Sequence, residues 1–147
     1  MPLTQIFFKG DRSENFRRAV SEGVHRAMVE AYNVPASGKF HIVTQVKDSD
    51  LFFDETYAGV QRSSNFIFIQ LTAANTRNTD QKQAFFKRTA ELLSQDPGIR
   101  TEDIVIDIVE NAKENWFFGT LSKLTHGSSG EKRPECIPAS VGTLNGR

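Results

Sequence analysis

Pro2 could act as a catalytic amine. If Met1 is removed, the ring nitrogen of Pro2 becomes a free secondary amine at the head of an apolar segment. A free α-amine has a pKa of about 8, and burial or a nearby cation lowers that pKa enough for general-base catalysis at neutral pH. The same amine could attack a carbonyl carbon and form an iminium. If Met1 is retained, the nitrogen is an amide and neither role is possible.

Arg77 is a candidate anchor for a carboxylate. It lies in the polar segment TAANTRNTDQ, between an apolar run typical of a strand and the start of a helical pattern. Loops in that position commonly hold ligand groups, and a guanidinium matches a carboxylate through two parallel hydrogen bonds. The alternative is an arginine that is simply exposed to solvent.

An aromatic cluster follows later in the chain. Trp116, Phe117 and Phe118 stand together in the segment ENWFFG, whose surroundings are otherwise polar. These side chains could line an apolar pocket, seal a subunit interface or complete the hydrophobic core.

The other chemically interesting side chains predict no metal or cofactor site. His25, His41 and His126 fall on different predicted elements without the spacing of metal ligands. The single cysteine, Cys136, has no evident base partner and cannot form an internal disulfide, which fits a reducing compartment. The sequence also lacks a glycine-rich phosphate loop, a Cys-x-x-Cys pair and a nucleophile elbow.

Length and composition predict a single domain. The chain has 147 residues, of which 38% are hydrophobic and 12 are phenylalanine, so a packed core is available. Eighteen basic and 18 acidic side chains cancel, which argues against nucleic acid or an anionic membrane as partner. Without a long apolar run or the basic start of a secretion signal, a cytoplasmic protein is expected.

The first half of the chain predicts a strand, a helix and a second strand. Residues 3–9 are apolar and predict a strand, and Ser13 is a suitable N-cap for a helix that ends near Tyr32. Pro35 prevents the helix from continuing, and residues 39–46 predict the next strand. The apolar positions of the helix are Phe16, Val20, Val24, Ala27, Met28 and Ala31. Those on one face of the second strand are Phe40, Ile42, Thr44 and Val46.

The second half repeats this order. Residues 48–62 lack clear periodicity and predict an excursion with short extended pieces. Thr79 is the expected N-cap of the second helix, in which Ala84, Phe85 and Leu93 should face inward together with Thr89 and Leu92. The remaining predicted elements are a strand at 65–71, a polar loop at 72–80, a helix at 80–94 and a strand at 104–109.

Two β-α-β units in one small domain predict an α/β fold. We expect parallel pairing within each unit, a four-stranded mixed sheet and both helices on one face of it. A ferredoxin-like fold has the same rhythm. Residues 1–125 should form the domain, while the Gly-, Ser- and Pro-rich residues 126–147 predict a flexible tail or an arm draped on a neighbouring subunit.

Several stretches together resemble the tautomerase superfamily, and most closely its malonate semialdehyde decarboxylase-like branch. They are MPL at the start, HRAMVEAYNVP, HIVTQV, TRNTDQKQAFF and IVENAKENWFFG, and they span residues 2 to about 120. The resemblance implies the tautomerase β-α-β fold, a homotrimer, no cofactor and an amino-terminal proline in a pocket near the subunit boundaries.

The resemblance also assigns roles to particular residues. Pro2 matches the catalytic proline, and Arg77 matches an arginine that holds the substrate carboxylate. A second arginine of the decarboxylases is replaced here by Asn75. Trp116 and Phe118 match the aromatic wall of the substrate pocket. Where the decarboxylases carry a functional aspartate, this chain has Gly38.

Three functions follow as hypotheses. The first is a tautomerase for small 2-oxo or enol carboxylic acids, with the Pro2 amine as general base and acid. The second is a decarboxylase or hydratase of a 3-oxo or unsaturated acid such as malonate semialdehyde, which the glycine at position 38 disfavours. The third is a non-catalytic binding or signalling protein on the same fold.

Overall fold

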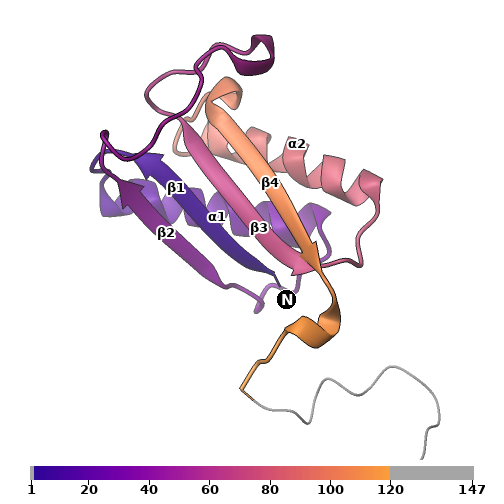
Figure 1. Cartoon of the computed structure of the whole chain (residues 1–147). Coiled ribbons are helices and arrows are strands. Elements are labelled where there is room, and N and C mark those ends of the chain that lie inside the picture. The colour runs from indigo at the N-terminus through magenta and orange to yellow at the C-terminus, as the bar shows by residue number, and fades with distance from the viewer. Residues whose placement is uncertain (1, 120–147) are drawn as a thin grey trace, which may run out of the picture. The chain divides into compact units, whose positions relative to one another are not determined.

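The computed structural model describes residues 2–119 and divides the chain into two units, Met1–Trp116 and Phe117–Arg147. The predicted tail at 126–147 lies outside the described residues. Within residues 2–119, all helices and strands belong to the first unit (Figure 1). They are β1 (Leu3–Lys9), α1 (Glu14–Ala31), β2 (His41–Val46), β3 (Ile67–Ala74), α2 (Thr79–Gln95) and β4 (Ile104–Asn111), with short 3₁₀ turns η1 (Tyr57–Gly59), η2 (Thr101–Asp103) and η3 (Lys113–Asn115).

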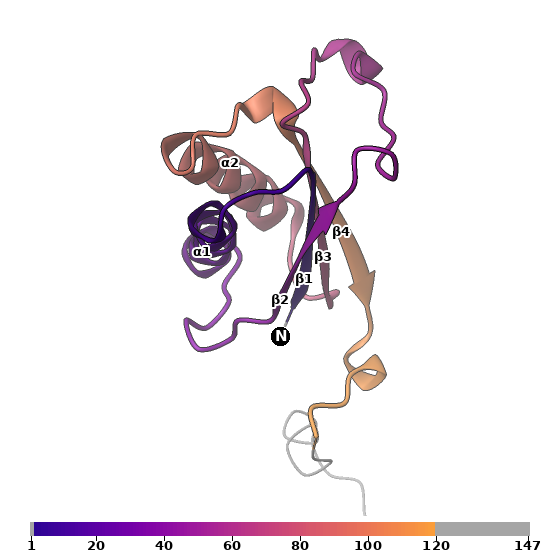
Figure 2. The same cartoon turned by 90° about the vertical axis from the view of Figure 1, so that its left-hand side faces the viewer.

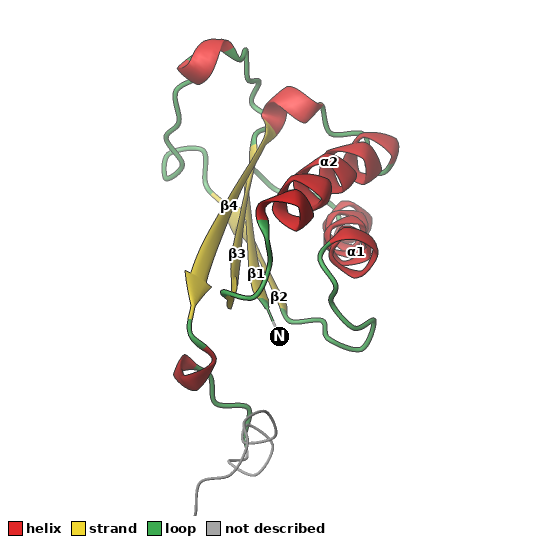
Figure 3. Ribbon diagram, turned by 90° about the vertical axis from the view of Figure 1, so that its right-hand side faces the viewer, coloured by secondary structure: helices red, strands yellow, loops and turns green. Residues whose placement is uncertain are grey.

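The strands form the predicted mixed sheet. Their order is β2-β1-β3-β4. β1 runs parallel to β2, β3 runs parallel to β4, and the two central strands β1 and β3 are antiparallel. Both helices cover one face of this sheet, and in the described part of the chain no helix lies on the opposite face (Figures 2 and 3).

The core fills the space between the helices and the sheet. Alternate residues of β1 and β3 point into it because successive side chains of a strand leave opposite faces. Gly23 of α1 lets the two helices approach closely, since a Cβ placed there would lie 2.8 Å from Leu93 Cδ2. The largest fully buried side chains include Tyr32, Phe8, Phe85, Ile6 and Met28.

The second helix begins one residue earlier than predicted, and its cap is different. Asn78, and not Thr79, is the N-cap: its Oδ1 accepts the Gln81 backbone N–H at 2.9 Å, and Gln81 Oε1 accepts the Asn78 N–H at 3.1 Å. This reciprocal pair satisfies two helix-end donors, whereas a cap at Thr79 would start the helix one residue later and would lose the pair between Asn78 and Gln81. Ala84 was predicted to face inward but is exposed, because Phe85 occupies the buried position beside it.

The third strand is displaced along the sequence. It covers Ile67–Ala74 where 65–71 was predicted, so the first residues of the predicted polar loop 72–80 are strand. Antiparallel pairing of Leu3 with Thr72 and parallel pairing of Ala74 with Asn111 extend β3 into that polar segment. Tertiary hydrogen bonds thus override the local polarity.

The excursion between β2 and β3 contains one short 3₁₀ turn and no strand. Its return to the sheet is fixed by Asp103, which is fully buried and accepts the Ser63 N–H at 2.6 Å and the Ser63 hydroxyl at 2.7 Å. Phe53 stacks on Phe66 with ring centroids 4.2 Å apart. The excursion is therefore tied to the domain at its C-terminal side, although it has little regular structure.

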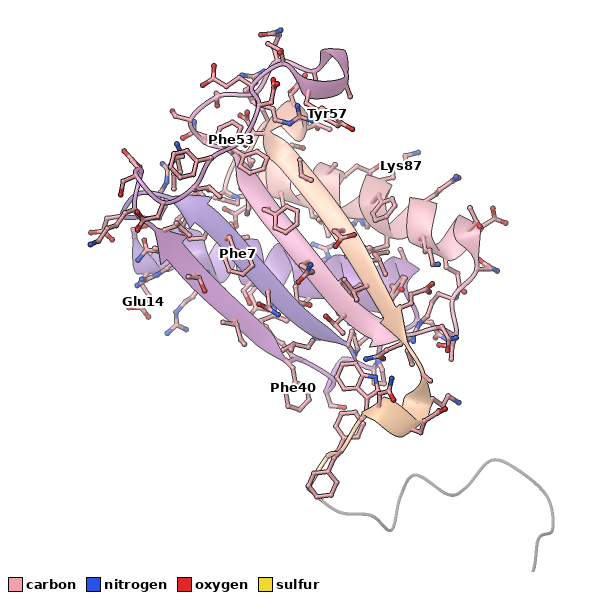
Figure 4. The ribbon with its side chains drawn as sticks, viewed as in Figure 1. Phe7, Glu14, Phe40, Phe53, Tyr57 and Lys87 are labelled. Atoms are coloured by element: carbon pink, nitrogen blue, oxygen red, sulfur yellow. The ribbon has the colours of Figure 1, made fainter. Side chains whose placement is uncertain are left out.

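The sheet face without helices is partly apolar. Phe7 pairs with Phe68 across β1 and β3, their ring centroids 6.4 Å apart, and Figure 4 shows Phe7 on this face. Ile42 of β2 and Val109 of β4 are 51% and 41% exposed. The predicted alternation of β2 is thus present, and its apolar side chains lie on the uncovered face, while Val43 packs on the core.

Candidate active site

One end of the sheet gathers most of the residues that the sequence singled out. The N-terminal ends of β1 and β2 and the C-terminal ends of β3 and β4 meet there, as the pairing of Thr4 with His41 and of Ala74 with Asn111 requires. Figure 1 shows this end beside the N-terminus of the described chain. Pro2 lies at its centre, buried, directly before the residue that pairs with Thr72 of β3.

Arg77 lies at this end in the short connection between β3 and α2. Its Nε donates to the Tyr32 carbonyl at 3.1 Å and its Nη2 to the Asn33 carbonyl at 3.3 Å. Its Nη1 donates to Thr76 Oγ1 at 2.8 Å. The guanidinium also lies over the Tyr32 ring, 4.9 Å from the ring centroid. Arg77 is therefore held by the end of α1 and is not a freely solvated loop arginine.

Asn75 and Trp116 meet at a residue that the sequence analysis did not select. The Asn75 backbone N–H donates to the Asn111 carbonyl at 2.9 Å, and the Trp116 indole N–H donates to Asn111 Oδ1 at 2.5 Å. Asn111 is the last residue of β4, so the connection places the indole at the same end of the sheet as Arg77. Phe118 belongs to the second unit, where its side chain is 42% exposed, and its part in a pocket wall stays a prediction.

Burial and three charged side chains act on the pKa of the Tyr32 hydroxyl. Burial raises the pKa of Tyr32 above its ordinary value, and Glu110 raises it further, while Arg77 and Lys82 oppose the change. Lys82 and Glu110 form an ion pair of 2.8 Å in which each side chain is less than a third exposed. This pair joins the first turn of α2 to the end of β4, close to Arg77 in the chain.

The loop before β2 is tightly packed around Gly38, the residue that the resemblance matched to an aspartate of the decarboxylases. Gly38 is buried, and its N–H bonds to the Pro35 carbonyl at 2.8 Å. A Cβ at Gly38 would lie 3.1 Å from that carbonyl oxygen and 3.4 Å from Val34 Cγ1. Phe40 follows this loop at the same end of the sheet, is half exposed, and has its carbonyl bonded to the Thr4 N–H (Figure 4).

No metal-binding arrangement is present among residues 2–119, in which no group of three or more His, Cys, Asp or Glu side chains is suitably placed. Within that same range, no helix is long and apolar enough to cross a membrane. A surface depression of about 530 Å³ lies at the opposite end of β1 and β2, beside Gly10 and Gln45, and contains none of the predicted site residues.

Sequence reasoning missed Tyr32, Asn33 and Asn111. Asn33 has a positive φ of 55°, and its side-chain type in the segment YNVP was a signal for a left-handed residue after a helix. No local signal marks Tyr32 or Asn111 as neighbours of Arg77 and Trp116, because those contacts join different elements.

The chain belongs to the tautomerase family. Two family models described as tautomerase enzyme match it, one at residues 38–119 and the other at residues 2–61. The probable tautomerase YusQ of Bacillus subtilis (strain 168) is 34% identical over 119 residues, which cover 81% of this chain and 94% of that protein. The probable tautomerase YrdN of the same organism is 29% identical, covering 81% and 92%.

Within the family, the chain belongs to the malonate semialdehyde decarboxylase-like branch. The structure of FG41 malonate semialdehyde decarboxylase inhibited by 3-bromopropiolate is similar with a TM-score of 0.75 and 35% identity, covering 82% of this chain and 91% of that one. A second malonate semialdehyde decarboxylase, described with decarboxylase and hydratase activities, has a TM-score of 0.75 and 28% identity over 80% and 91%. A fused 4-OT symmetric trimer shares the fold at 14% identity, with a TM-score of 0.66 over 80% and 91%.

Proposed function

We propose that this chain is a tautomerase that moves a proton between carbon and oxygen in a small 2-oxo or enol carboxylic acid. Met1 is removed, and the secondary amine of Pro2 takes the proton from one atom of the substrate and returns it to another. Arg77 holds the substrate carboxylate, with Asn75 beside it. Trp116 and Phe118 cover the carbon skeleton.

The observation that carries this proposal is the common location of Pro2 and Arg77. Pro2 is buried at the start of β1, next to the end of β3, and Arg77 follows the end of β3 by three residues. Burial and a nearby cation both disfavour the protonated amine, so a pKa below that of an ordinary α-amine is expected for Pro2. A neutral amine at pH 7 can act as the general base.

The first experiment combines intact mass with an ultraviolet assay. The purified protein should lack the mass of one methionine and should accelerate ketonisation of the enol form of phenylpyruvate. Pro2→Ala should abolish that acceleration, because the ring amine is the proposed base. A retained methionine together with a rate that Pro2→Ala leaves unchanged would remove amine catalysis and favour the binding-protein hypothesis.

Arg77→Ala tests the carboxylate anchor. Loss of a bidentate, charge-assisted hydrogen bond between Arg77 and the substrate carboxylate should raise KM roughly tenfold or more. Arg18→Ala is a matched control, since Arg18 is an exposed arginine paired with Glu14 on α1 at 2.7 Å. Equal KM values for Arg77→Ala and the unchanged protein would remove Arg77 from substrate binding.

A decarboxylase or hydratase is the second candidate, favoured by the 35% identity to FG41 malonate semialdehyde decarboxylase. A protonated Pro2 could polarise the oxo group of a 3-oxo acid, or the neutral amine could form an iminium, and either would assist loss of carbon dioxide. Against this stands Gly38, where an added side chain would press on the Pro35 carbonyl. Carbon dioxide release from malonate semialdehyde that is abolished by Pro2→Ala would favour this candidate over the tautomerase.

The active form is proposed to be a homotrimer in the cytoplasm. The apolar side chains on the uncovered sheet face, including Phe7 and Ile42, suit burial against further copies of the chain. The trimeric fused 4-OT proteins share this fold. Sedimentation equilibrium should give three times the chain mass, and Ile42→Asp should lower it, whereas a monomeric mass for the unchanged protein would refute the assembly.

A further inference from the structure

Arg77 uses part of its hydrogen-bonding capacity within the protein. A guanidinium has five N–H donors, and three of them are directed to Tyr32, Asn33 and Thr76 through Nε, Nη2 and Nη1. The two remaining N–H groups are on Nη1 and Nη2. They form the end of the guanidinium that could hold a carboxylate.

Two of the three acceptors are carbonyls at the C-terminal end of α1. Such carbonyls have no partner within their own helix, and the helix dipole makes them favourable for a cation. The positive φ of Asn33 turns the chain there, so the Tyr32 and Asn33 carbonyls both reach Arg77. The anchoring point is thus a fixed feature of the fold, 44 and 45 residues away from Arg77 in the sequence.

The Tyr32 ring supports the flat face of the guanidinium. It lies 4.9 Å from Arg77 Cζ, which is within the range of a cation–π contact. The ring cannot move aside, because Tyr32 is fully buried and packs on Phe85 with centroids 5.3 Å apart. The Tyr32 hydroxyl has no hydrogen-bond partner within residues 2–119, so the ring and not the hydroxyl makes the contact.

We infer that Tyr32 is a positioning residue for Arg77: its ring and carbonyl fix the guanidinium so that two N–H groups are presented to a substrate carboxylate. The inference rests on the proposed function, since it needs Arg77 as the carboxylate anchor. Tyr32 itself touches no substrate. Loss of its ring should therefore weaken substrate capture through Arg77 while leaving the chemistry at Pro2 largely intact.

The kinetic test compares Tyr32→Leu with Tyr32→Phe, using the enol form of phenylpyruvate. Tyr32→Leu removes the aromatic face and should raise KM roughly three- to tenfold with kcat within about twofold. Tyr32→Phe keeps the ring and should restore the KM of the unchanged protein. Phe8→Leu is the control for general loosening of the core, because Phe8 is a buried phenylalanine near the other end of β1, where its ring packs edge-on against Phe16 with centroids 5.5 Å apart.

A second measurement is independent of activity. In nitrogen-15 spectra, the Arg77 Nε–H proton should exchange slowly with solvent, because it is hydrogen-bonded to the Tyr32 carbonyl. Its chemical shift should also be displaced by the ring current of Tyr32. Tyr32→Leu should remove the ring-induced shift and accelerate exchange, whereas Tyr32→Phe and Phe8→Leu should preserve the shift and the slow exchange.

The outcomes separate the two proposals. If Arg77→Ala raises KM and Tyr32→Leu does not, the positioning role is wrong and the carboxylate anchor stands. If the Arg77 signal responds to Tyr32→Leu but Arg77→Ala leaves KM unchanged, Tyr32 does position Arg77, but the proposal that Arg77 binds the substrate carboxylate is wrong. Equal KM increases in Tyr32→Leu and Phe8→Leu would show that Tyr32 acts only as an ordinary core residue.

Discussion

Acidification from pH 7 to pH 4.5 should destabilise the folded chain through His41. This side chain is largely buried at the start of β2, with its Nδ1 3.0 Å from the Ser21 hydroxyl oxygen and its ring centroid 5.8 Å from that of His25 on α1. Burial, followed by the positive charges of Lys39 and His25, lowers the pKa of His41 from 6.5 to about 4, and Glu22 only partly opposes this.

The size and sign of the effect follow from proton linkage. Between pH 6.5 and about 4, the unfolded chain binds a proton at His41 that the folded chain does not, so stability falls as pH falls through this window. One pKa unit corresponds to about 1.4 kcal/mol, and most of the shift is expressed by pH 4.5, which gives a loss of about 2 kcal/mol. Carboxylates with lowered pKa values, such as Glu22, also stabilise the folded chain, and this contribution is lost as the pH falls below about 4.5. Most of the pH range used for His41 lies above that value.

Urea unfolding followed by circular dichroism at pH 7.0, 5.5 and 4.5 would measure this loss. The protein concentration should be held constant, because assembly contributes to apparent stability. His41→Gln removes the titrating ring and should flatten the profile between pH 7 and 4.5, even if it lowers stability overall. The reasoning is refuted if the unchanged protein and His41→Gln lose the same free energy of unfolding over this range.

Three further substitutions test the packing and capping that stabilise the fold. Asp103→Ala should lower the free energy of unfolding by about 3 kcal/mol, because the N–H and hydroxyl of the partly buried Ser63 lose a buried, charged acceptor, and Asp103→Asn should cost less in the same urea titration. Asn78→Ala removes the capping box of α2 and should cost about 1 kcal/mol by the same measurement, with no change expected if the cap is unimportant. Gly23→Val should cost about 1–3 kcal/mol and lower the melting temperature, since its side chain would collide with Leu93; a melting temperature that stays the same would contradict the close helix contact.

Hydrophobic periodicity was sufficient to predict the helices and strands and most of the buried core residues. The three-and-four spacing from Phe16 to Ala31 predicted α1 and its buried face, because a helix of 3.6 residues per turn places those positions together. The repeated β-α-β order predicted parallel pairing within each unit and both helices on one face, but it left a ferredoxin-like fold open, and the strand order β2-β1-β3-β4 came from the structure. Errors occurred where two local signals were nearly equivalent, as with Thr79 against Asn78, or where sheet pairing extended β3 into a polar segment.

The sequence predicted which residues belong to the candidate site but not the contacts that hold them. The sequence by itself, read with the family resemblance, selected Pro2, Arg77 and Trp116, because an amine, a guanidinium and an indole are recognisable from their chemistry. Only the tertiary structure decided that Arg77 lies on the end of α1 over the Tyr32 ring and that Asn111 joins Trp116 to the end of β3. Those contacts depend on strand order and on how helix ends meet the sheet, and hydrogen bonds across such distances leave no periodic pattern in the chain.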